Sequence, residues 1–588
     1  MLRKEISLLL YILFLGINLF AQTTNPFIAL VEPSQAKNTV TTSKQFIIGS
    51  TCKTCELTIN DKSVKVYSTG AFAYEIQLSK GDNTFNIVAK QGNTKQNKTL
   101  VYSFVPQVSA TPVATFAIES VETFPAGDLL LKGGDEIQFK IKAFPSCNAM
   151  VLIGDKAIPL YEMPVTSENP IPGIYQGTYI VNPIDSFKNQ AFTVTLNKVD
   201  YKNIVIQSTA KLTANKFSIL NKSMSDVLLT KGRLAHLEYG LGEDRLGGAK
   251  IGYIDSLVQL KLIGKVGTHY KVRLATNRIA YIPDEHVTLM PKGTFSPLSL
   301  TGKIKTYGDS VYDYVSLQLF SRLPYQSIQQ TDPSKIIVDV FGATCNTNWI
   351  DQLQTAKEIK KLEYEQIADD IFRVYITLQH AQHWGYRIYY NGTNLMVKIN
   401  RQPKSLMLKD LTIAVDAGHG GNNTGAGGPT GVSEKELTLQ LSLKVKKQLE
   451  KEGAHVIMTR EKEMFFDNKE RILFYRDSTP NLLISIHLNS STDPIRISGT
   501  STFYRYIGFR QLSNCIYKRM LETGLKEYGN NGSFNFMLNS PIEYPNALIE
   551  TLFLSNPDEE MKILDPQFQQ QLAEKIVLGI KDFLEGCK

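Results

Sequence analysis

The sequence predicts a multidomain protein in which several all-β modules precede one C-terminal α/β domain. At 588 residues, the chain is too long for a single hydrophobic core. Between about residues 27 and 401, short segments alternate apolar and polar side chains and are separated by turn residues, which is typical of strands. Between about residues 409 and 586, continuous apolar runs alternate with amphipathic patterns, which favours a mostly parallel sheet flanked by helices.

The N-terminus, residues 1–21, has the pattern of a secretory signal peptide. Arg3 and Lys4 give a charged start, and the apolar run from Leu8 to Phe20 is too short to span a bilayer. Cleavage is expected after Ala21, and an uncleaved anchor is the alternative. No later run is apolar over about 18 residues, so no other membrane span is predicted. We therefore expect an exported protein of the periplasm or cell envelope.

Charge and cysteine content narrow the classes of partner. The net charge of +8 is spread along the chain without a long basic run, so nucleic-acid binding is not expected. A weak positive balance suits an anionic envelope polymer, or serves only solubility. Cys52 and Cys55 could close a small disulfide in an exported protein. A redox site is less favoured because the surroundings are strands, and a zinc ribbon would need a second pair. Cys515 lies among apolar residues of a predicted helix and should be buried.

Two β-sandwiches are expected first, at residues 27–105 and 111–215. Short strands with turns every eight to twelve residues are typical of such folds, and both segments resemble bacterial immunoglobulin-like modules. The alternation that defines their inward faces is clearest at Phe72, Tyr74, Ile76 and Leu78, and at Ile137, Phe139 and Ile141.

Two smaller β modules follow. Residues 217–291 resemble the bacterial SH3-like fold, which binds cell-wall peptide in some proteins and is a spacer in others. Residues 302–401 resemble the AMIN targeting module, and the strand around Asp339 and the strand of Arg373 carry this resemblance. The AMIN resemblance implies binding to peptidoglycan, and a spacer is the alternative. The run 401–404 is the expected linker into the last domain.

The residues suited to catalysis lie in the last domain, 409–586. The run Asp416-Ala417-Gly418-His419-Gly420-Gly421 follows a short apolar strand, Leu411 to Val415. A histidine at the carboxyl end of a strand, among glycines, faces a mouth where backbone can approach a ligand closely. Asp416 is near enough in sequence to hold that imidazole from behind.

Three further residues complete a possible metal site. Glu434 begins an amphipathic helix, and His487 follows the apolar run 482–486. Glu550 lies at the end of another apolar run, 546–551. Two imidazoles and one carboxylate leave one tetrahedral position of Zn²⁺ open for water, which is the ligand pattern of catalytic zinc. Glu550 is then the natural base.

Each of these residues alone has an ordinary structural explanation, since a Glu at a helix start interacts with the helix dipole and a His after a strand is often buried and hydrogen-bonded. Three strand ends and one helix start within one domain make coincidence a poor explanation. A zinc site of this kind suits any enzyme that cleaves an amide. A zinc peptidase acting within the stem peptide of peptidoglycan is therefore one enzymatic alternative. A non-catalytic wall-binding protein is the alternative from another class.

In order along the chain stand the motifs DAGHGG, GVSEKEL, MTR, KERI, SIHLNS, GTSTFY and ALIETLFLSNPDEE. Together they resemble the zinc-dependent N-acetylmuramoyl-L-alanine amidase family of the amidase_3 type. The resemblance implies that His419, Glu434 and His487 bind zinc and that Glu550 is the catalytic Glu. Arg471 matches a recurrent Arg of uncertain role, which we also count as a candidate catalytic residue. The implied reaction separates the stem peptide from N-acetylmuramic acid, with peptidoglycan as the partner.

Two departures from the family pattern stand out, at Thr551-Leu552 and at Tyr475-Arg476-Asp477. Neither is expected to touch a zinc ligand. Some amidases of this family carry an inserted helix between the second His and the final Glu that blocks the site. Here one strand, one helix from about 509 to 525 and one loop account for that interval, so we expect an open site.

Overall fold

The computed structural model describes residues 25–106, 111–220, 225–242 and 244–588. The predicted signal peptide lies outside these residues. Two compact units divide the chain: the first holds strands β1–β8, and the second holds all later strands and helices. None of the helices in the described part of the chain is long and apolar enough to cross a membrane.

The β1–β8 segment forms two sheets that enclose one core, as expected for a sandwich. One sheet has the order β1-β3-β6 and the other β2-β8-β7-β4-β5. Cys52 and Cys55 form a disulfide and are buried in this core. The strands are β1 Ala29–Glu32, β2 Lys37–Val40, β3 Lys44–Ser50, β4 Glu56–Ile59, β5 Lys62–Val64, β6 Ala71–Gln77, β7 Gly81–Gln91 and β8 Thr94–Phe104.

The β9–β16 segment contains a second core, in which the alternating Ile137, Phe139 and Ile141 are buried. Its last strand continues to Ile219 and so crosses the predicted module boundary at 215–217. Many of the residues of this strand occupy exposed positions. The strands are β9 Ile118–Phe124, β10 Leu129–Leu131, β11 Glu136–Ala143, β12 Asn148–Ile153, β13 Lys156–Glu162, β14 Ile174–Ile180, β15 Gln190–Val199 and β16 Val205–Ile219.

The β17–β23 segment is joined to the preceding one by hydrogen bonding, because β10 pairs with β20. The strands are β17 Val227–Thr230, β18 His236–Glu238, β19 Lys250–Tyr253, β20 Gln259–Val266, β21 His269–Ala275, β22 Arg278–Pro283 and β23 Val287–Leu289, with the short helix η1 Asp284–His286. Residues of this segment and of the next share one hydrophobic core.

The β24–β34 segment has two main sheets, of order β30-β25-β26-β34-β33 and β27-β28-β32-β31. Asp339 and Arg373 are register partners on β28 and β32 and form an ion pair, with Arg373 Nε 2.6 Å from Asp339 Oδ1. The strands are β24 Ser299–Leu300, β25 Ile304–Gly308, β26 Tyr312–Leu317, β27 Tyr325–Thr331, β28 Ser334–Phe341, β29 Ala343–Thr344, β30 Ile350–Gln352, β31 Ile359–Ala368, β32 Ile371–Leu378, β33 Tyr386–Asn391 and β34 Asn394–Asn400.

The C-terminal segment, β35 to α5, is the predicted α/β domain. Its sheet has the order β36-β35-β37-β40-β38-β39, and β36, β35, β37 and β40 are parallel to one another. The strands are β35 Thr412–Ala417, β36 His455–Ile457, β37 Leu482–Asn489, β38 Thr500–Phe503, β39 Glu527–Asn531 and β40 Asn546–Phe553. The helices are α1 Glu434–Lys451, α2 Asn468–Ser478, α3 Arg510–Leu521, α4 Pro557–Ile563 and α5 Pro566–Gly586, with η2 Leu408–Asp410, η3 Ile507–Phe509 and η4 Met537–Asn539.

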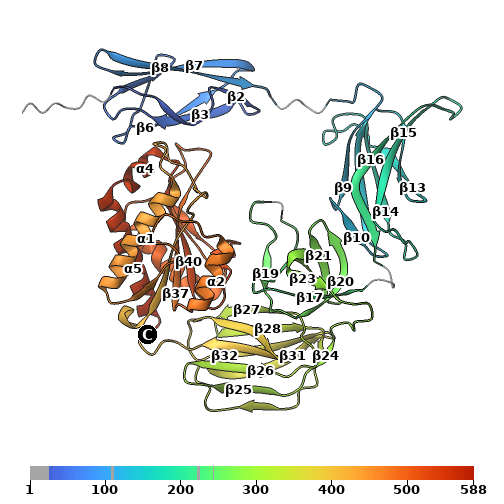
Figure 1. The fold of residues 1–588 in the computed structure, drawn as a ribbon, viewed down its shortest axis with the longest axis vertical. Helices are drawn as coiled ribbons and strands as arrows, with labels where there is room; N and C mark the ends of the chain where they lie inside the picture. The colour runs from blue at the N-terminus through green and yellow to red at the C-terminus, as the bar shows by residue number, and fades with distance from the viewer. Residues whose placement is uncertain (1–24, 107–110, 221–224, 243) are drawn as a thin grey trace, which may run out of the picture. The chain divides into compact units, whose positions relative to one another are not determined.

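Helices cover both faces of this sheet. In Figure 1, α1 and α5 lie on one side of β37 and β40, and α2 lies on the other. The larger core includes Cys515 of α3 and four apolar residues of α1, namely Leu437, Leu441, Val445 and Leu449. Trp384, which precedes β33, belongs to this core as well, and its ring centroid lies 5.8 Å from that of Phe583 on α5. Between His487 and Glu550, α3 is the one α-helix, as the sequence predicted.

Candidate metal centre

The carboxyl edge of the parallel strands carries the candidate residues. His419 follows the end of β35, and His487 lies near the end of β37. Glu550, on β40, is the register partner of His487, so the two side chains lie on the same face of neighbouring strands. Glu434 is the first residue of α1. Four segments that are separate in sequence therefore meet at one edge.

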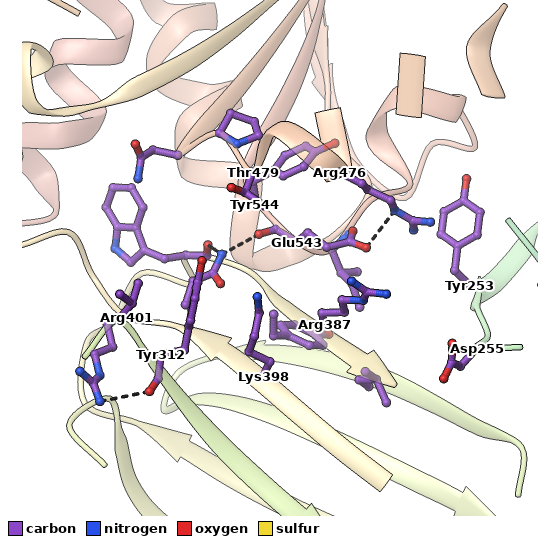
Figure 2. A pocket seen from close by; sticks show the side chains of 18 of the residues that line it. Tyr253, Asp255, Tyr312, Arg387, Lys398, Arg401, Arg476, Thr479, Glu543 and Tyr544 are labelled. Carbon is purple, nitrogen blue, oxygen red and sulfur yellow. Dashed lines mark hydrogen bonds and ion pairs between the residues drawn. The ribbon is translucent and has the colours of Figure 1, made fainter. Parts of the chain in front are cut away.

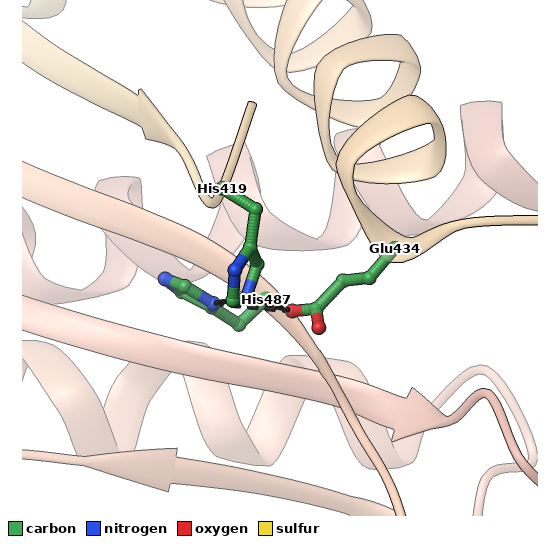
Figure 3. A group of neighbouring side chains, drawn as sticks. All are labelled: His419, Glu434 and His487. Atoms are coloured by element: carbon green, nitrogen blue, oxygen red, sulfur yellow. Dashed lines mark hydrogen bonds and ion pairs between the residues drawn. The ribbon is translucent and has the colours of Figure 1, made fainter. Parts of the chain in front are cut away.

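Three of these side chains converge on one point. His419 Nε2 lies 3.0 Å from Glu434 Oε1, and His487 Nδ1 lies 3.1 Å from the same oxygen. The two imidazole nitrogens are 3.2 Å apart. Figure 3 shows both rings and the carboxylate pointing toward one another. Among the described residues, this is the one group of three or more His, Cys, Asp or Glu side chains arranged to hold a metal ion.

The geometry fits zinc. Bonds of about 2.0–2.1 Å in a tetrahedral arrangement separate neighbouring ligand atoms by about 3.3 Å, close to the distances found. The two imidazoles are partly open to solvent, at 22% and 18% exposure, whereas the carboxylate is only 4% exposed. The group is therefore open to solvent on the side of the imidazoles.

Two glycines make room for this convergence. A Cβ on Gly418 would lie 2.4 Å from the ring of His487. A Cβ on Gly425 would lie 2.4 Å from Glu434 Oε2 and 2.7 Å from the ring of His419. Gly418 and Gly425 are therefore required by the close approach of the candidate ligands.

Hydrogen bonds orient the ligands. His419 Nδ1 donates to Asn423 Oδ1 over 2.9 Å, which leaves Nε2 free to bind a metal. Glu434 accepts from the backbone N–H of Ala426 and of Leu488, over 2.7 and 2.9 Å. Burial opposes the charge of Glu434, but its hydrogen bonds with the two imidazoles hold its pKa well below the usual range. The carboxylate is thus kept ionised, as a ligand must be.

Asp416 does not hold His419 from behind, so that expectation was wrong. Its fully buried carboxylate instead accepts from Arg471 Nη1 over 2.8 Å, Ser485 Oγ over 3.0 Å and Tyr475 Oη over 3.1 Å. Asn423 takes the position behind His419. No sequence motif marks this residue, because an amide in a Gly/Asn-rich loop is ordinary turn chemistry.

Arg471 lies behind the group formed by His419, Glu434 and His487, and it does not face the open side. Its guanidinium donates to the carbonyls of Ala417 and His419 as well as to Asp416. A second buried arginine, Arg460 of the MTR motif, donates to the carbonyls of Ala417 and Gly418. The structure therefore places Arg471 in a clamp that holds the backbone carrying His419.

Glu550 is the fourth candidate. Its Oε2 is buried and has no hydrogen-bond partner in the described structure. Burial raises the pKa of Glu550 well above its usual range, the charge of Glu434 raises it further, and Arg245 lowers it. An enclosed, unpartnered carboxylate oxygen beside the cluster is available for a proton.

Arg245 belongs to the loop before β19, and sequence reasoning did not single it out. Asn535 attaches this loop to the C-terminal segment by donating from Nδ2 to the carbonyls of Leu246 and Gly248, over 3.2 and 2.9 Å. Arg505 donates to the carbonyl of Lys250. The β17–β23 segment therefore borders the site, which no local motif could indicate.

Comparison with known proteins gives two family matches. The family described as N-acetylmuramoyl-L-alanine amidase matches residues 413–582, and the AMIN domain family matches residues 304–399. The germination-specific N-acetylmuramoyl-L-alanine amidase of Bacillus subtilis (strain 168) is 33% identical over 198 residues, which are 30% of this chain and 82% of that protein. The probable cell wall amidase LytH of Staphylococcus epidermidis is 30% identical over 196 residues.

The alignment with LytH covers 33% of this chain and 65% of LytH, so this chain spans only part of that relative's length. A crystal structure of N-acetylmuramoyl-L-alanine amidase from Clostridium difficile 630 is 30% identical. It aligns with 30% of this chain and 98% of its own, at a TM-score of 0.29.

Proposed function

The chain belongs to the N-acetylmuramoyl-L-alanine amidase family, and we propose that it hydrolyses the amide between N-acetylmuramic acid and L-alanine in peptidoglycan. The observation that carries this proposal is the convergence of His419 Nε2, His487 Nδ1 and Glu434 Oε1 within 3.2 Å of one another. These three atoms would hold one zinc ion. Glu550 stands on the strand next to His487, in register with it.

Bound zinc would polarise the scissile carbonyl and favour ionisation of the attacking water. Glu550 accepts the proton of that water at Oε2, the oxygen that has no partner in the protein. The same carboxyl then passes the proton to the nitrogen of the leaving L-alanine. A raised pKa suits this double role, because the group must first take the proton and then hold it for transfer.

Arg471 and Arg460 act as positioning residues in this proposal. Both bind backbone carbonyls of residues 417–419, and Arg471 is also paired with the buried Asp416. They hold the turn that carries His419, and neither reaches the substrate. A charge carried by Arg245, at the border of the site, is suited to an anionic part of the substrate.

The upstream segments are proposed to hold the enzyme on the wall. The AMIN match supports this role for residues 302–401. The β1–β8 and β9–β16 segments are proposed as immunoglobulin-like spacers, and the β17–β23 segment as an SH3-like module. The catalytic domain is assigned to residues 409–586, and the whole protein to the periplasm or cell envelope.

The test is digestion of purified sacculi with the full-length protein, followed by mass spectrometry of the soluble products. Free stem peptides beginning with L-alanine, together with peptide-free glycan, are expected. New ends within the stem peptide would identify a peptidase instead. Binding without any released product would identify a non-catalytic wall protein. Glu550→Gln protein is the blank for contaminating hydrolases.

A further inference from the structure

A cavity of about 500 Å³ lies where three segments of the second unit meet. Figure 2 shows its lining: Tyr253 and Asp255 come from the β17–β23 segment, Arg387 and Lys398 from β33 and β34, and Arg476 from α2. Its volume falls within the range of about 300–1,000 Å³ that is typical of small-ligand sites.

The cavity is separate from the candidate metal centre. Its C-terminal lining includes Asn481, which precedes β37, and Tyr544, which precedes β40. These residues mark the amino edge of the sheet, whereas the metal cluster lies at the carboxyl edge. His487 follows Asn481 by six residues of extended chain, which at about 3.3 Å per residue is roughly 20 Å. A ligand in the cavity does not touch the metal ligands.

Positive charge dominates the lining. Arg476 pairs with Glu543 over 2.9 Å, Arg401 pairs with the buried Asp313, and Arg233 pairs with Asp477. The remaining three cations, Arg387, Lys398 and Lys404, have no ion pair with any described residue. In all, the lining contains six cationic residues, Arg233, Arg387, Lys398, Arg401, Lys404 and Arg476, and two acidic ones, Asp255 and Glu543.

Two of the unpaired cations face each other. Arg387 and Lys398 are register partners on the antiparallel strands β33 and β34. Like charges directly opposite each other on neighbouring strands are unfavourable. Lys398 Nζ lies 3.9 Å from the ring centroid of Tyr312, which directs its ammonium group along an aromatic wall. An anion bound between these two side chains would remove their repulsion.

The cavity also offers groups for other parts of a ligand. Asp255 Oδ2 accepts from the backbone N–H of Tyr390, whereas its Oδ1 has no hydrogen bond with a described residue. The hydroxyls of Tyr253 and Tyr544 are buried without partners. Aromatic walls, two cations and one acceptor carboxylate together suit a compact molecule that carries both carboxylates and an ammonium group.

We propose that this cavity binds a short peptide with free carboxyl groups, held by Arg387 and Lys398, with its amino group toward Asp255. The peptides released by wall hydrolysis belong to this class, so the identity of the natural ligand rests on the proposed amidase function. The binding of such a peptide by the cavity does not depend on that function. The residues at 475–477 that depart from the family pattern support a site particular to this chain, because Arg476 lines the cavity and Asp477 pairs with Arg233.

The test uses full-length Glu550→Gln protein and isothermal titration calorimetry. The probe is the synthetic tetrapeptide Ala-Glu-Lys-Ala with free termini, and the control ligand is the same peptide with every carboxyl group amidated. The free peptide is expected to bind, and amidation is expected to weaken binding by about tenfold or more. Absence of binding, or equal binding of both peptides, would overturn the proposal.

Variants test the assigned residues. Arg387→Gln with Lys398→Met should weaken binding by about tenfold or more, while zinc content and the unfolding transition show that the protein is intact. Lys305→Met is the matched control, because Lys305 also lies over a tyrosine ring but outside the cavity, and it should bind like the parent. Equal binding by the double variant would refute the assignment.

Two further measurements separate the possible ligands. If inorganic phosphate binds as tightly as the peptide, the cavity is a general anion site and the peptide proposal is wrong. If the double variant loses sacculus binding while the parent protein does not bind the soluble peptide, the cavity binds intact wall and the proposal is again wrong. Absence of amidase activity in the wild-type protein would leave the peptide titration interpretable, so the two proposals fail separately.

Discussion

The two edges of the C-terminal sheet treat charge in opposite ways. At the carboxyl edge, two imidazoles surround one buried carboxylate, and Arg471 is paired with Asp416. In the cavity beside the amino edge, Arg387 of β33 and Lys398 of β34 are register partners, and neither has an ion pair with a described residue. The first edge gathers a carboxylate between two imidazoles, whereas the cavity beside the second sets two like charges opposite each other. Both arrangements mark a place that suits a ligand of opposite charge, a cation at the first and an anion at the second.

Removing a ligand at the carboxyl edge should have the largest effect. In His487→Ala, one imidazole of the trio is gone, so zinc should be lost and turnover on sacculi should fall to the level of a blank. Elemental analysis of the purified protein and mass spectrometry of the digest check this. Equimolar zinc in the variant would show that His487 is not a ligand.

Glu550→Gln should separate chemistry from metal binding. The amide cannot take the proton, so turnover should fall roughly 10²- to 10⁴-fold, while zinc content stays that of the wild type. Muropeptide release and elemental analysis are the measurements. The exposed Glu574→Gln on α5 is the control and should behave as wild type. Zinc loss in the Glu550 variant would make Glu550 a ligand instead of the base.

Arg471→Met, and Arg387→Met after it, compare the stability of the two edges directly. Arg471→Met leaves Asp416 buried and unpaired, which should destabilise the protein by about 3–5 kcal/mol. Calorimetric unfolding of the full chain measures this, and the C-terminal transition should move to lower temperature. Arg519→Met, which removes a surface pair with Asp582, is the control and should leave the unfolding transition close to that of the wild type. A variant of Arg471 as stable as this control would contradict the clamp.

Arg387→Met at the amino edge should have the smallest effect. It relieves the repulsion on Lys398. Burial lowers the pKa of Lys398, and the charge of Arg387 lowers it further. Stability should therefore stay unchanged or rise by up to about 0.5 kcal/mol. The same calorimetric experiment applies. A loss comparable with that of Arg471→Met would reveal an anionic partner within the protein and would remove the contrast between the edges.

The sequence located the carboxyl edge well, because its evidence is local. Apolar runs predict β35, β37 and β40, and the residues at their ends are read directly from short motifs. The orienting roles of Asn423 and Asp416 were not accessible, since an amide or carboxylate has several partners within reach and sequence does not select one. The end of the second β module was misplaced because β16 is long and polar on its exposed side.

The amino edge was not predictable, because its lining comes from three segments far apart in the chain. Arg387 and Lys398 look like ordinary exposed positions of alternating strands. Tyr475-Arg476-Asp477 was visible as a departure from the family pattern, but its contacts with Tyr253 and Arg233 depend on packing between modules. A departure from the family pattern marks a position that differs, and the structure shows which residues that position contacts.

The position of Trp384 has a consequence for the order in which the protein is assembled. Its ring belongs to the C-terminal core and packs near Phe583 on α5. Synthesis proceeds from the N-terminus, so the β-rich cores of residues 27–105 and 111–220 can close while α5 has not yet emerged. The indole must wait for almost two hundred further residues before it is covered. A chain stopped short of α5 would thus leave that ring uncovered and open to proteases.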